Sequence, residues 1–290
     1  FQGERKGSLL SVLDRTMTPM GARRLRQWVL YPLMDEQAIR ARHDTVEELV
    51  ERYAERQDLR AALKGVQDLE RLCGRVVSGS AGPRDLAAVK QTLDAAGPIR
   101  ARLRAFDAHL LASLSDQIAE LPEVCELIGR AIAEDPPATL KAAGFIRAGF
   151  NAELDELRNI RRDAKEWIAR LESRERKRTG IQSLKVRYNR VFGYYIEVSK
   201  ANLKFVPTDF LRKQTLVNGE RYITPELKEY EAKVLTSEEE ALKLELSLFE
   251  EVRARLASYY LRMSAISQAL ATVDVMLALA EAAQANHWVR

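Results

Sequence analysis

The stretch that decides the fold runs from Leu184 to Lys228, LKVRYNRVFGYYIEVSKANLKFVPTDFLRKQTLVNGERYITPELK, in a chain of 290 residues. Apolar and polar residues alternate in it with a period of two, which is typical of half-buried β-strands. It also lies between two long helical patterns. We therefore expect a small antiparallel sheet at the tip of a helical stalk.

Two turns are expected within this segment. Asn218-Gly219 is the strongest short hairpin signal and stands between two strand-like stretches. A second turn is expected near Asn189 to Gly193, before the aromatic and β-branched residues that follow. Both turns should lie at the rim of the sheet.

The segment is also strongly basic. From Arg174 to Lys228 there are thirteen Lys and Arg residues against five Asp and Glu residues, a net charge of about +8. The whole chain carries only +4, so the remaining residues sum to about −4. Positive charge on a β-tip beside a mildly acidic helical body indicates an element that grips a polyanion. We take that polyanion to be duplex DNA.

Long helical patterns flank the segment on both sides. Asn151 is expected to cap a helix that ends at Thr179-Gly180 and is about 40 Å long at ~1.5 Å per residue. Its partner should begin at Thr224-Pro225 and run past Tyr260 without a break. Side by side, the two helices form an antiparallel arm.

The other residues predict a compact helical body. Thr18-Pro19 and Asp35 are helix starts, and Gly97-Pro98 and Leu121-Pro122 should punctuate two further helices. With 46% hydrophobic residues, the chain can bury a substantial core. The predicted fold is mainly α: a helical bundle body with two long antiparallel helical arms that carry a small antiparallel β domain.

Composition places the protein in a reducing, aqueous compartment. Cys73 and Cys125 lack the spacing of a metal site or redox pair and are expected to be small buried hydrophobes. There is no uninterrupted run of about 18 apolar residues and no signal peptide, so we expect a cytoplasmic protein with no membrane partner. Phe1-Gln2-Gly3 resembles what remains of a cleaved tag.

Catalysis has no support in the sequence. It contains no glycine-rich phosphate loop, no metalloprotease motif and no nucleophile elbow. His43 and His287 have no partner at metal-ligand spacing. We expect this chain not to be an enzyme and to hold neither metal nor cofactor.

The candidate binding residues lie at the two turns and on the strands that lead to them. Arg and Lys neutralise phosphates, while Asn, Gln and Thr donate hydrogen bonds that position a duplex without reading its sequence. The predicted DNA-contacting residues are Asn218, Lys213, Gln214, Thr215, Arg221, Asn189, Arg190, Lys185 and Arg187.

Other residues of the segment have two readings. Its aromatic residues either stack on single-stranded bases or, as we favour, fill the small core of the sheet. The cations from Arg174 to Arg178 either bind nucleic acid or complement the end of a helix. Arg23, Arg24 and Arg26 are expected on a solvated or interdomain face.

Three motifs, in order, resemble the MutS family of bacterial DNA mismatch-repair proteins. They are Ser8–Gly21 (SLLSVLDRTMTPMG), Gly193–Asn202 (GYYIEVSKAN) and Arg212–Glu231 (RKQTLVNGERYITPELKEYE). The resemblance runs from about Gly7 to Arg290. Phe210 stands where the family is expected to have Tyr.

The resemblance implies a lever (core) domain split around an inserted clamp domain that contacts the DNA backbone, with Asn218 as the leading contact. The implied boundaries are 1–6 for a tag remnant or linker, 7–150 and 241–290 for the lever domain, and 151–240 for the clamp. It further implies that the mismatch-reading, connector and ATPase domains, with ATP and Mg, belong to a longer, homodimeric protein.

Two alternatives stay open. One is a helical scaffold whose tip docks an acidic protein partner. The other is a homologue that grips DNA junctions in recombination. Competition by mixed-sequence duplex and preference for four-way DNA, respectively, would separate them from a clamp.

Overall fold

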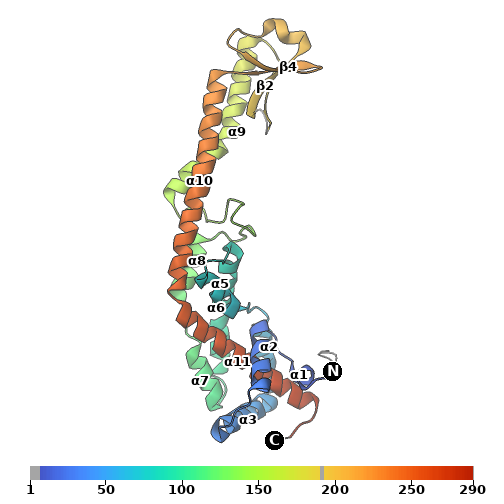
Figure 1. The fold of residues 1–290 in the computed structure, drawn as a ribbon, viewed down its shortest axis with the longest axis vertical. Coiled ribbons are helices and arrows are strands. Elements are labelled where there is room, and N and C mark those ends of the chain that lie inside the picture. The colour runs from blue at the N-terminus through green and yellow to red at the C-terminus, as the bar shows by residue number, and fades with distance from the viewer. Residues whose placement is uncertain (1–6, 190–192, 290) are drawn as a thin grey trace. The chain divides into compact units, whose positions relative to one another are not determined.

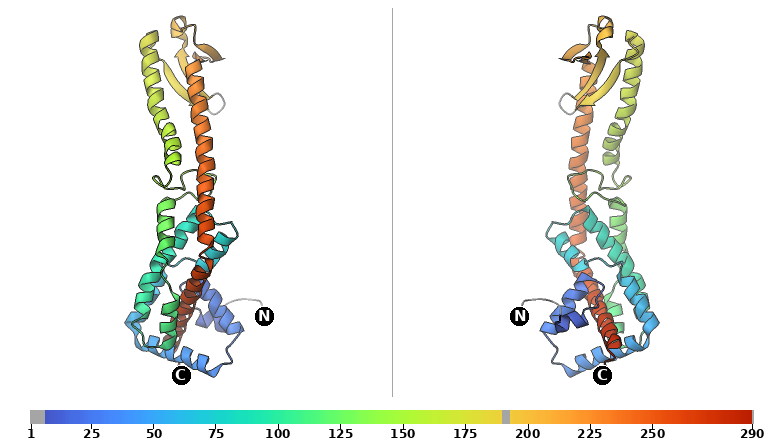
Figure 2. Two further views of the ribbon diagram at one scale, coloured as in Figure 1. Left: turned by 90° about the vertical axis from the view of Figure 1, so that its left-hand side faces the viewer. Right: turned by 90° about the vertical axis from the view of Figure 1, so that its right-hand side faces the viewer.

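The chain folds into two compact units. The computed structural model describes residues 7–189 and 193–289. Unit 1 comprises Phe1–Arg147 and Leu248–Arg290, and unit 2 comprises Ala148–Ser247. Unit 2 is thus inserted into the sequence of unit 1 (Figures 1 and 2).

The described part of unit 1 is helical apart from an isolated β-bridge between Ile132 and Ile146. Its helices are α1 (Leu9–Leu13), α2 (Pro19–Leu30), α3 (Glu36–Glu51), α4 (Tyr53–Leu63), α5 (Leu69–Val77), α6 (Pro83–Leu103), α7 (His109–Gln117), α8 (Pro122–Ala131), the end of α10 (Pro225–Ala257) and α11 (Tyr260–Ala285). Because α11 contacts α1 to α5 and α7, it is the central helix of the unit.

Helix α11 is apolar on all sides. It is long enough to cross a membrane and has a mean hydropathy of 1.5 in its most apolar window, but 72% of that window is buried inside the fold. A helix that is hydrophobic all round and buried among other helices is a core helix. This helix contains no uninterrupted apolar run of about 18 residues, because Ser267, Gln268, Thr272 and Asp274 lie within it.

A buried carboxylate fixes α2 to α11. Asp274 accepts hydrogen bonds from Met17 N at 2.8 Å, Thr18 N at 2.8 Å and Thr18 Oγ1 at 2.7 Å. Thr18 Oγ1 in turn accepts from Gly21 N at 3.0 Å and caps α2, as predicted. Burial raises the pKa of the Asp274 carboxyl, and its three hydrogen bonds act in the opposite direction.

Two predicted helix boundaries are wrong. Gly97-Pro98 lies inside α6, where Ala96 and Ile99 are buried, so packing outweighs the hydrogen bond that proline removes. The helix from Pro225 stops at Ala257, because Tyr259 N bonds to Leu256 O and tightens the last turn. The starts at Asp35 and Pro122 are confirmed.

Unit 2 contains an antiparallel pair of long helices, α9 (Ala152–Thr179) and the first part of α10. Asn151 caps α9, and Gly180 ends it with φ of 74°, as predicted. The described contacts between the two helices include Arg158 to Glu245 at 2.7 Å, Trp167 stacked on Tyr230 at 3.7 Å between ring centroids, and Arg174 to Glu226. Residue numbers rise along one helix as they fall along the other, so the pair is antiparallel.

A four-stranded antiparallel sheet lies where α9 ends and α10 begins (Figure 1). Its strands are β1 (Lys185–Asn189), β2 (Gly193–Ser199), β3 (Leu211–Thr215) and β4 (Gly219–Ile223), in the order β1-β2-β4-β3. The short 3₁₀ helix η1 (Lys200–Phe205) follows β2, and a bulge interrupts β3 at Lys213. The predicted fold class, mainly α with a small antiparallel sheet, is confirmed.

One face of the sheet closes a small core. It comprises Leu171, Ile181, Leu184, Val186, Ile196, Val198, Phe210, Tyr222 and Leu227, all buried. On the outer border of β1, Val186 N donates to the Glu172 carboxylate of α9 at 2.8 Å. The sheet is therefore attached to the helix pair on one face and at one edge.

Replacing Gly21 by Ala should destabilise unit 1. A Cβ there would lie 2.1 Å from Asp274 Oδ2, so the carboxylate must move and lose its hydrogen bonds to Met17 and Thr18. We expect a loss of about 1–3 kcal/mol in the free energy of unfolding, measured by urea denaturation. Gly74→Ala is the control, because a Cβ at this helical position meets nothing within 4 Å; equal losses for both variants would contradict the role given to Asp274.

Candidate nucleic-acid interface

The two predicted turns lie at opposite ends of the sheet. Asn189 pairs with Gly193 at one end, and Ser199 pairs with Gly219 at the other. We call these the Asn189 end and the Asn218 end. Strand β2 has seven residues, so about 20 Å separates the two ends. The predicted contact residues therefore do not form one continuous surface.

The Asn218 end presents an exposed turn. Leu216 N donates to Gly219 O at 2.8 Å, which closes the predicted Asn-Gly hairpin. At its apex Asn218 is exposed and Val217 is 84% exposed. Lys200 N donates to Asn218 O at 3.2 Å, so the residue after β2 lies beside the turn. The exposed side chain of Asn218 is thus carried on a backbone that two hydrogen bonds hold in place.

Basic residues lie on both edge strands of the sheet. Lys213 and Thr215 are exposed on β3, an edge strand. Lys185 and Arg187 are exposed on β1, the other edge strand. Among the described residues, none of these three cations has an ion-pair partner in the structure. They are available to an external anion.

The second face of the sheet is polar. Cross-strand partners project from the same side of a sheet, so the pairs of β1, β2, β4 and β3 define this face. The pairs are Lys185 with Glu197, Arg187 with Tyr195, Glu197 with Arg221, and Arg221 with Gln214. Three of the predicted cations thus share one face with a single carboxylate.

Arg221 is committed to partners within the sheet. Its Nη1 donates to Gln214 Oε1 at 2.8 Å, its Nε lies 3.8 Å from the Glu197 carboxylate, and its guanidinium lies 4.3 Å from the centre of the Tyr195 ring. Only 18% of its side chain is exposed. In the free chain, Arg221 and Gln214 therefore brace the hairpin instead of standing open to solvent.

The Asn189 end lies against α10. A Cβ on Gly193, which has φ of 72°, would fall 1.6 Å from a carboxylate oxygen of Glu231. Burial and the nearby Glu238 carboxylate raise the pKa of Tyr194. Asn189 is half-buried, and Arg190 lies outside the described residues. The carboxylates at this end oppose an approaching phosphate.

The cations at the end of α9 are largely neutralised. Arg174 pairs with Glu226, Arg176 pairs with Glu172 at 2.6 Å, and Arg178 pairs with Asp209 at 2.9 Å. Arg176 Nε also donates to Leu184 O at 2.8 Å. These contacts favour the structural reading of this basic run.

Most aromatic residues of the segment fill the sheet. Tyr195, Phe210 and Tyr222 are 5%, 6% and 7% exposed. Burial and the hydrogen bond to Glu220 raise the pKa of Tyr222 to about 12. Tyr188 and Phe205 are the exceptions, at 52% and 53%. The core reading of the aromatics holds for Phe210 and Tyr222, whereas Tyr195 is buried on the opposite face of the sheet, where the Arg221 guanidinium covers its ring.

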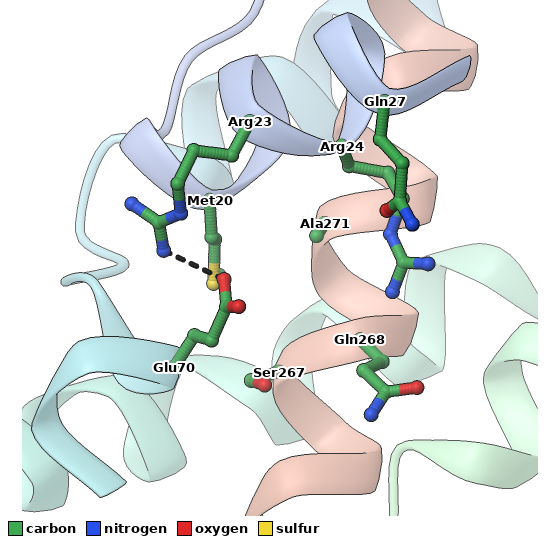
Figure 3. A pocket seen from close by; sticks show the side chains of 8 residues that line it. All are labelled: Met20, Arg23, Arg24, Gln27, Glu70, Ser267, Gln268 and Ala271. Atoms are coloured by element: carbon green, nitrogen blue, oxygen red, sulfur yellow. Dashed lines mark hydrogen bonds and ion pairs between the residues drawn. The ribbon is translucent and has the colours of Figure 1, made fainter. Parts of the chain in front are cut away.

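Unit 1 contains a polar pocket. Within the described residues, no group of three or more His, Cys, Asp or Glu residues could hold a metal ion. Figure 3 shows the pocket between α2, α5 and α11, which Met20, Arg23, Arg24, Gln27, Glu70, Ser267, Gln268 and Ala271 line. Arg23 is bound there to Glu70 and also to Asp68. Cys73 is buried, and burial raises the pKa of its thiol to about 12, so it is inert.

The chain is thus a multi-helix unit into which a second unit, made of a long helix pair and a small antiparallel sheet, is inserted. The family model for MutS domain III matches residues 1–280. The chain belongs to the MutS domain III family.

Relatives agree over nearly the whole chain. DNA mismatch repair protein MutS of Symbiobacterium thermophilum is 51% identical over 288 residues, which is 99% of this chain and 33% of that protein. The MutS proteins of Myxococcus xanthus and an Anaeromyxobacter species are 50% and 49% identical, again over 99% of this chain. These cover 32% and 33% of the relatives, so the chain spans about a third of their length.

Replacing Arg221 and Arg187 by Ala, one at a time, should show that Arg221 stabilises the sheet and that the exposed Arg187 does not. Arg221→Ala removes the hydrogen bond to Gln214 and the ring contact with Tyr195, and should cost about 2 kcal/mol. Arg187→Ala, on the same face, should change stability by less than about 0.5 kcal/mol. Amide hydrogen exchange of β3 and β4 measures both. Equal protection in the two variants would remove Arg221 from the brace.

Proposed function

We propose that this chain is the part of a DNA mismatch-repair protein that holds duplex DNA by its backbone. The observation that carries the proposal is the exposed Asn218 turn, held by backbone hydrogen bonds, together with exposed cations on both edge strands of the same sheet. The names of the relatives, each a DNA mismatch repair protein, supply the process. Unit 2 acts as the clamp and unit 1 as the lever.

The contact residues have different roles in this proposal. Asn218 and the amides of its turn donate to phosphate oxygens, while Lys213, Lys185 and Arg187 neutralise phosphate charge and Thr215 supports them. Gln214 and Arg221 position the turn. Asn189 and Arg190, at the opposite end of the sheet, would reach DNA only where the duplex runs along the polar face.

Nucleotide chemistry belongs to the rest of the longer protein. The chain itself binds and transmits but does not hydrolyse. We propose that mismatch-reading, connector and ATPase domains, with ATP and Mg, and pairing into a homodimer complete the protein, which works in the cytoplasm. The relatives are about three times as long as this chain, which leaves room for such domains.

The long helices provide a means of transmission. At ~1.5 Å per residue, the 28 residues of α9 are about 42 Å long. A rotation of about 10° at one end of such a rod displaces the other end by about 7 Å, which is comparable to other switching transitions. A nucleotide-driven rotation would thereby open or close the clamp.

Sequence-independent, salt-dependent binding is the first expected outcome. The chain should bind a perfect duplex and a mismatched duplex with equal affinity, and log K should fall linearly with log salt by about 0.9 for each phosphate neutralised. Gel-shift titrations across a salt series measure this. A preference for the mismatch would contradict a backbone grip, whereas failure of mixed-sequence duplex to compete would favour an acidic protein partner, and preference for a four-way junction would favour a recombination homologue.

Two variants test the turn itself. Asn218→Ala removes a donor to a charged acceptor and should lower affinity about tenfold or more at every salt concentration. Lys213→Ala should also reduce the salt slope by about 0.9. Lys243→Ala, at an exposed position on α10, is the charge-matched control and should bind as the wild type does. Unchanged binding in both turn variants would remove this turn from the interface.

A further inference from the structure

A cluster of neutral donors lies next to the Asn218 turn, and two of its three residues, Ser199 and Asn202, belong to the Gly193–Asn202 motif. Asn202 Nδ2 donates to Ser183 Oγ at 2.9 Å and to Ser199 Oγ at 3.2 Å, and the two hydroxyl oxygens are 3.3 Å apart. Ser183 is exposed, and Ser199 and Asn202 are half-buried. We call these three residues the hydroxyl cluster.

The cluster has a donor left over. The Asn202 amide nitrogen donates to both serine oxygens. The two serine hydroxyls bring two hydrogens, and their mutual contact uses only one. Because Asn202 already occupies an acceptor position on each serine oxygen, the remaining hydroxyl hydrogen is free to serve an acceptor outside the protein.

The surroundings of the cluster favour an anion. From Lys200 to Thr208 the sequence carries two lysines, Lys200 and Lys204, and no acidic residue. Both lysines are exposed, and neither has an ion-pair partner among the residues that the structure describes. The next acid, Asp209, is taken by Arg178 at 2.9 Å. Lysines therefore precede and follow Asn202 in the sequence, and both favour an anion at the cluster.

The hydroxyl cluster lies at the same end of the sheet as the Asn218 turn. Ser183 stands just before β1, Ser199 ends β2, and Asn218 stands just before β4. These three strands are neighbours in the sheet, so the row spans two strand spacings, about 10 Å. Duplex DNA carries one charge per about 3.4 Å of axis on each strand, so a row of this length faces two or three successive phosphates.

We propose that the hydroxyl cluster and Lys200 form a second phosphate subsite, which holds the DNA backbone phosphate next to the one held by the Asn218 turn. This inference rests on the proposed function and deepens it. The grip then has two components: lysines, whose contribution falls with salt, and neutral hydroxyl and amide donors, whose contribution does not.

Affinity and salt slope, measured on the whole 290-residue chain with linear duplex, separate the two components. Ser183→Ala and Asn202→Ala should each weaken binding about tenfold at all salt concentrations and leave the slope unchanged. Lys200→Ala should lower the slope by about 0.9. Ser173→Ala and Lys243→Ala, both at exposed positions on helices of the same unit, are the neutral and charged controls.

The outcomes distinguish this subsite from the proposed function. Wild-type affinity and slope in Ser183→Ala and Lys200→Ala, with Asn218→Ala weakened, would overturn the subsite and leave the clamp intact. A chain that binds no duplex at all would overturn both. Because Asn202 also holds the loop together, its variant counts only if its thermal unfolding matches that of the wild type; Ser183 and Lys200 are exposed, and their variants decide the matter independently.

Discussion

The packing of one apolar sheet face on α9 and the start of α10 is the constraint on which unit 2 depends. A sheet with one apolar face must bury that face against another element. Leu171, Leu184, Ile196 and Leu227 therefore fix the sheet to the helix pair. Since strands alternate, burying this face commits the other to solvent, and Lys185 and Arg187 point there as a consequence. The alternation of side chains along each strand therefore produces both the core and the candidate interface.

Local signals in the sequence determined the elements of unit 2 well. The Asn218-Gly219 hairpin, the Asn151 cap, the Gly180 end and the Pro225 start are all confirmed, because each depends on the backbone preferences of one or two residues. The strand order was not predictable in this way. β2 pairs with β4 across η1 and β3, and this pairing places the two turns about 20 Å apart.

The contacts of individual side chains could not be predicted from the sequence either. Arg221 reads as one more cation of a basic turn, yet Gln214, Glu197 and Tyr195 surround it. The hydroxyl cluster joins Ser183 to Asn202 across two strands, and no periodicity marks it. In unit 1, Asp274 meets Thr18 from the far end of the chain. Each is a long-range contact that only the folded topology creates.

The two edge strands of the sheet are protected against pairing with another molecule. Open strand edges invite pairing with another molecule. Here the Glu172 carboxylate occupies an amide of β1, and the bulge at Lys213 distorts β3. A strand from a second copy could not pair regularly with β1, because one of its amides already donates to Glu172. It could not pair regularly with β3 either, because that strand is bulged at Lys213. Two copies of the sheet can therefore lie close together without pairing edge to edge.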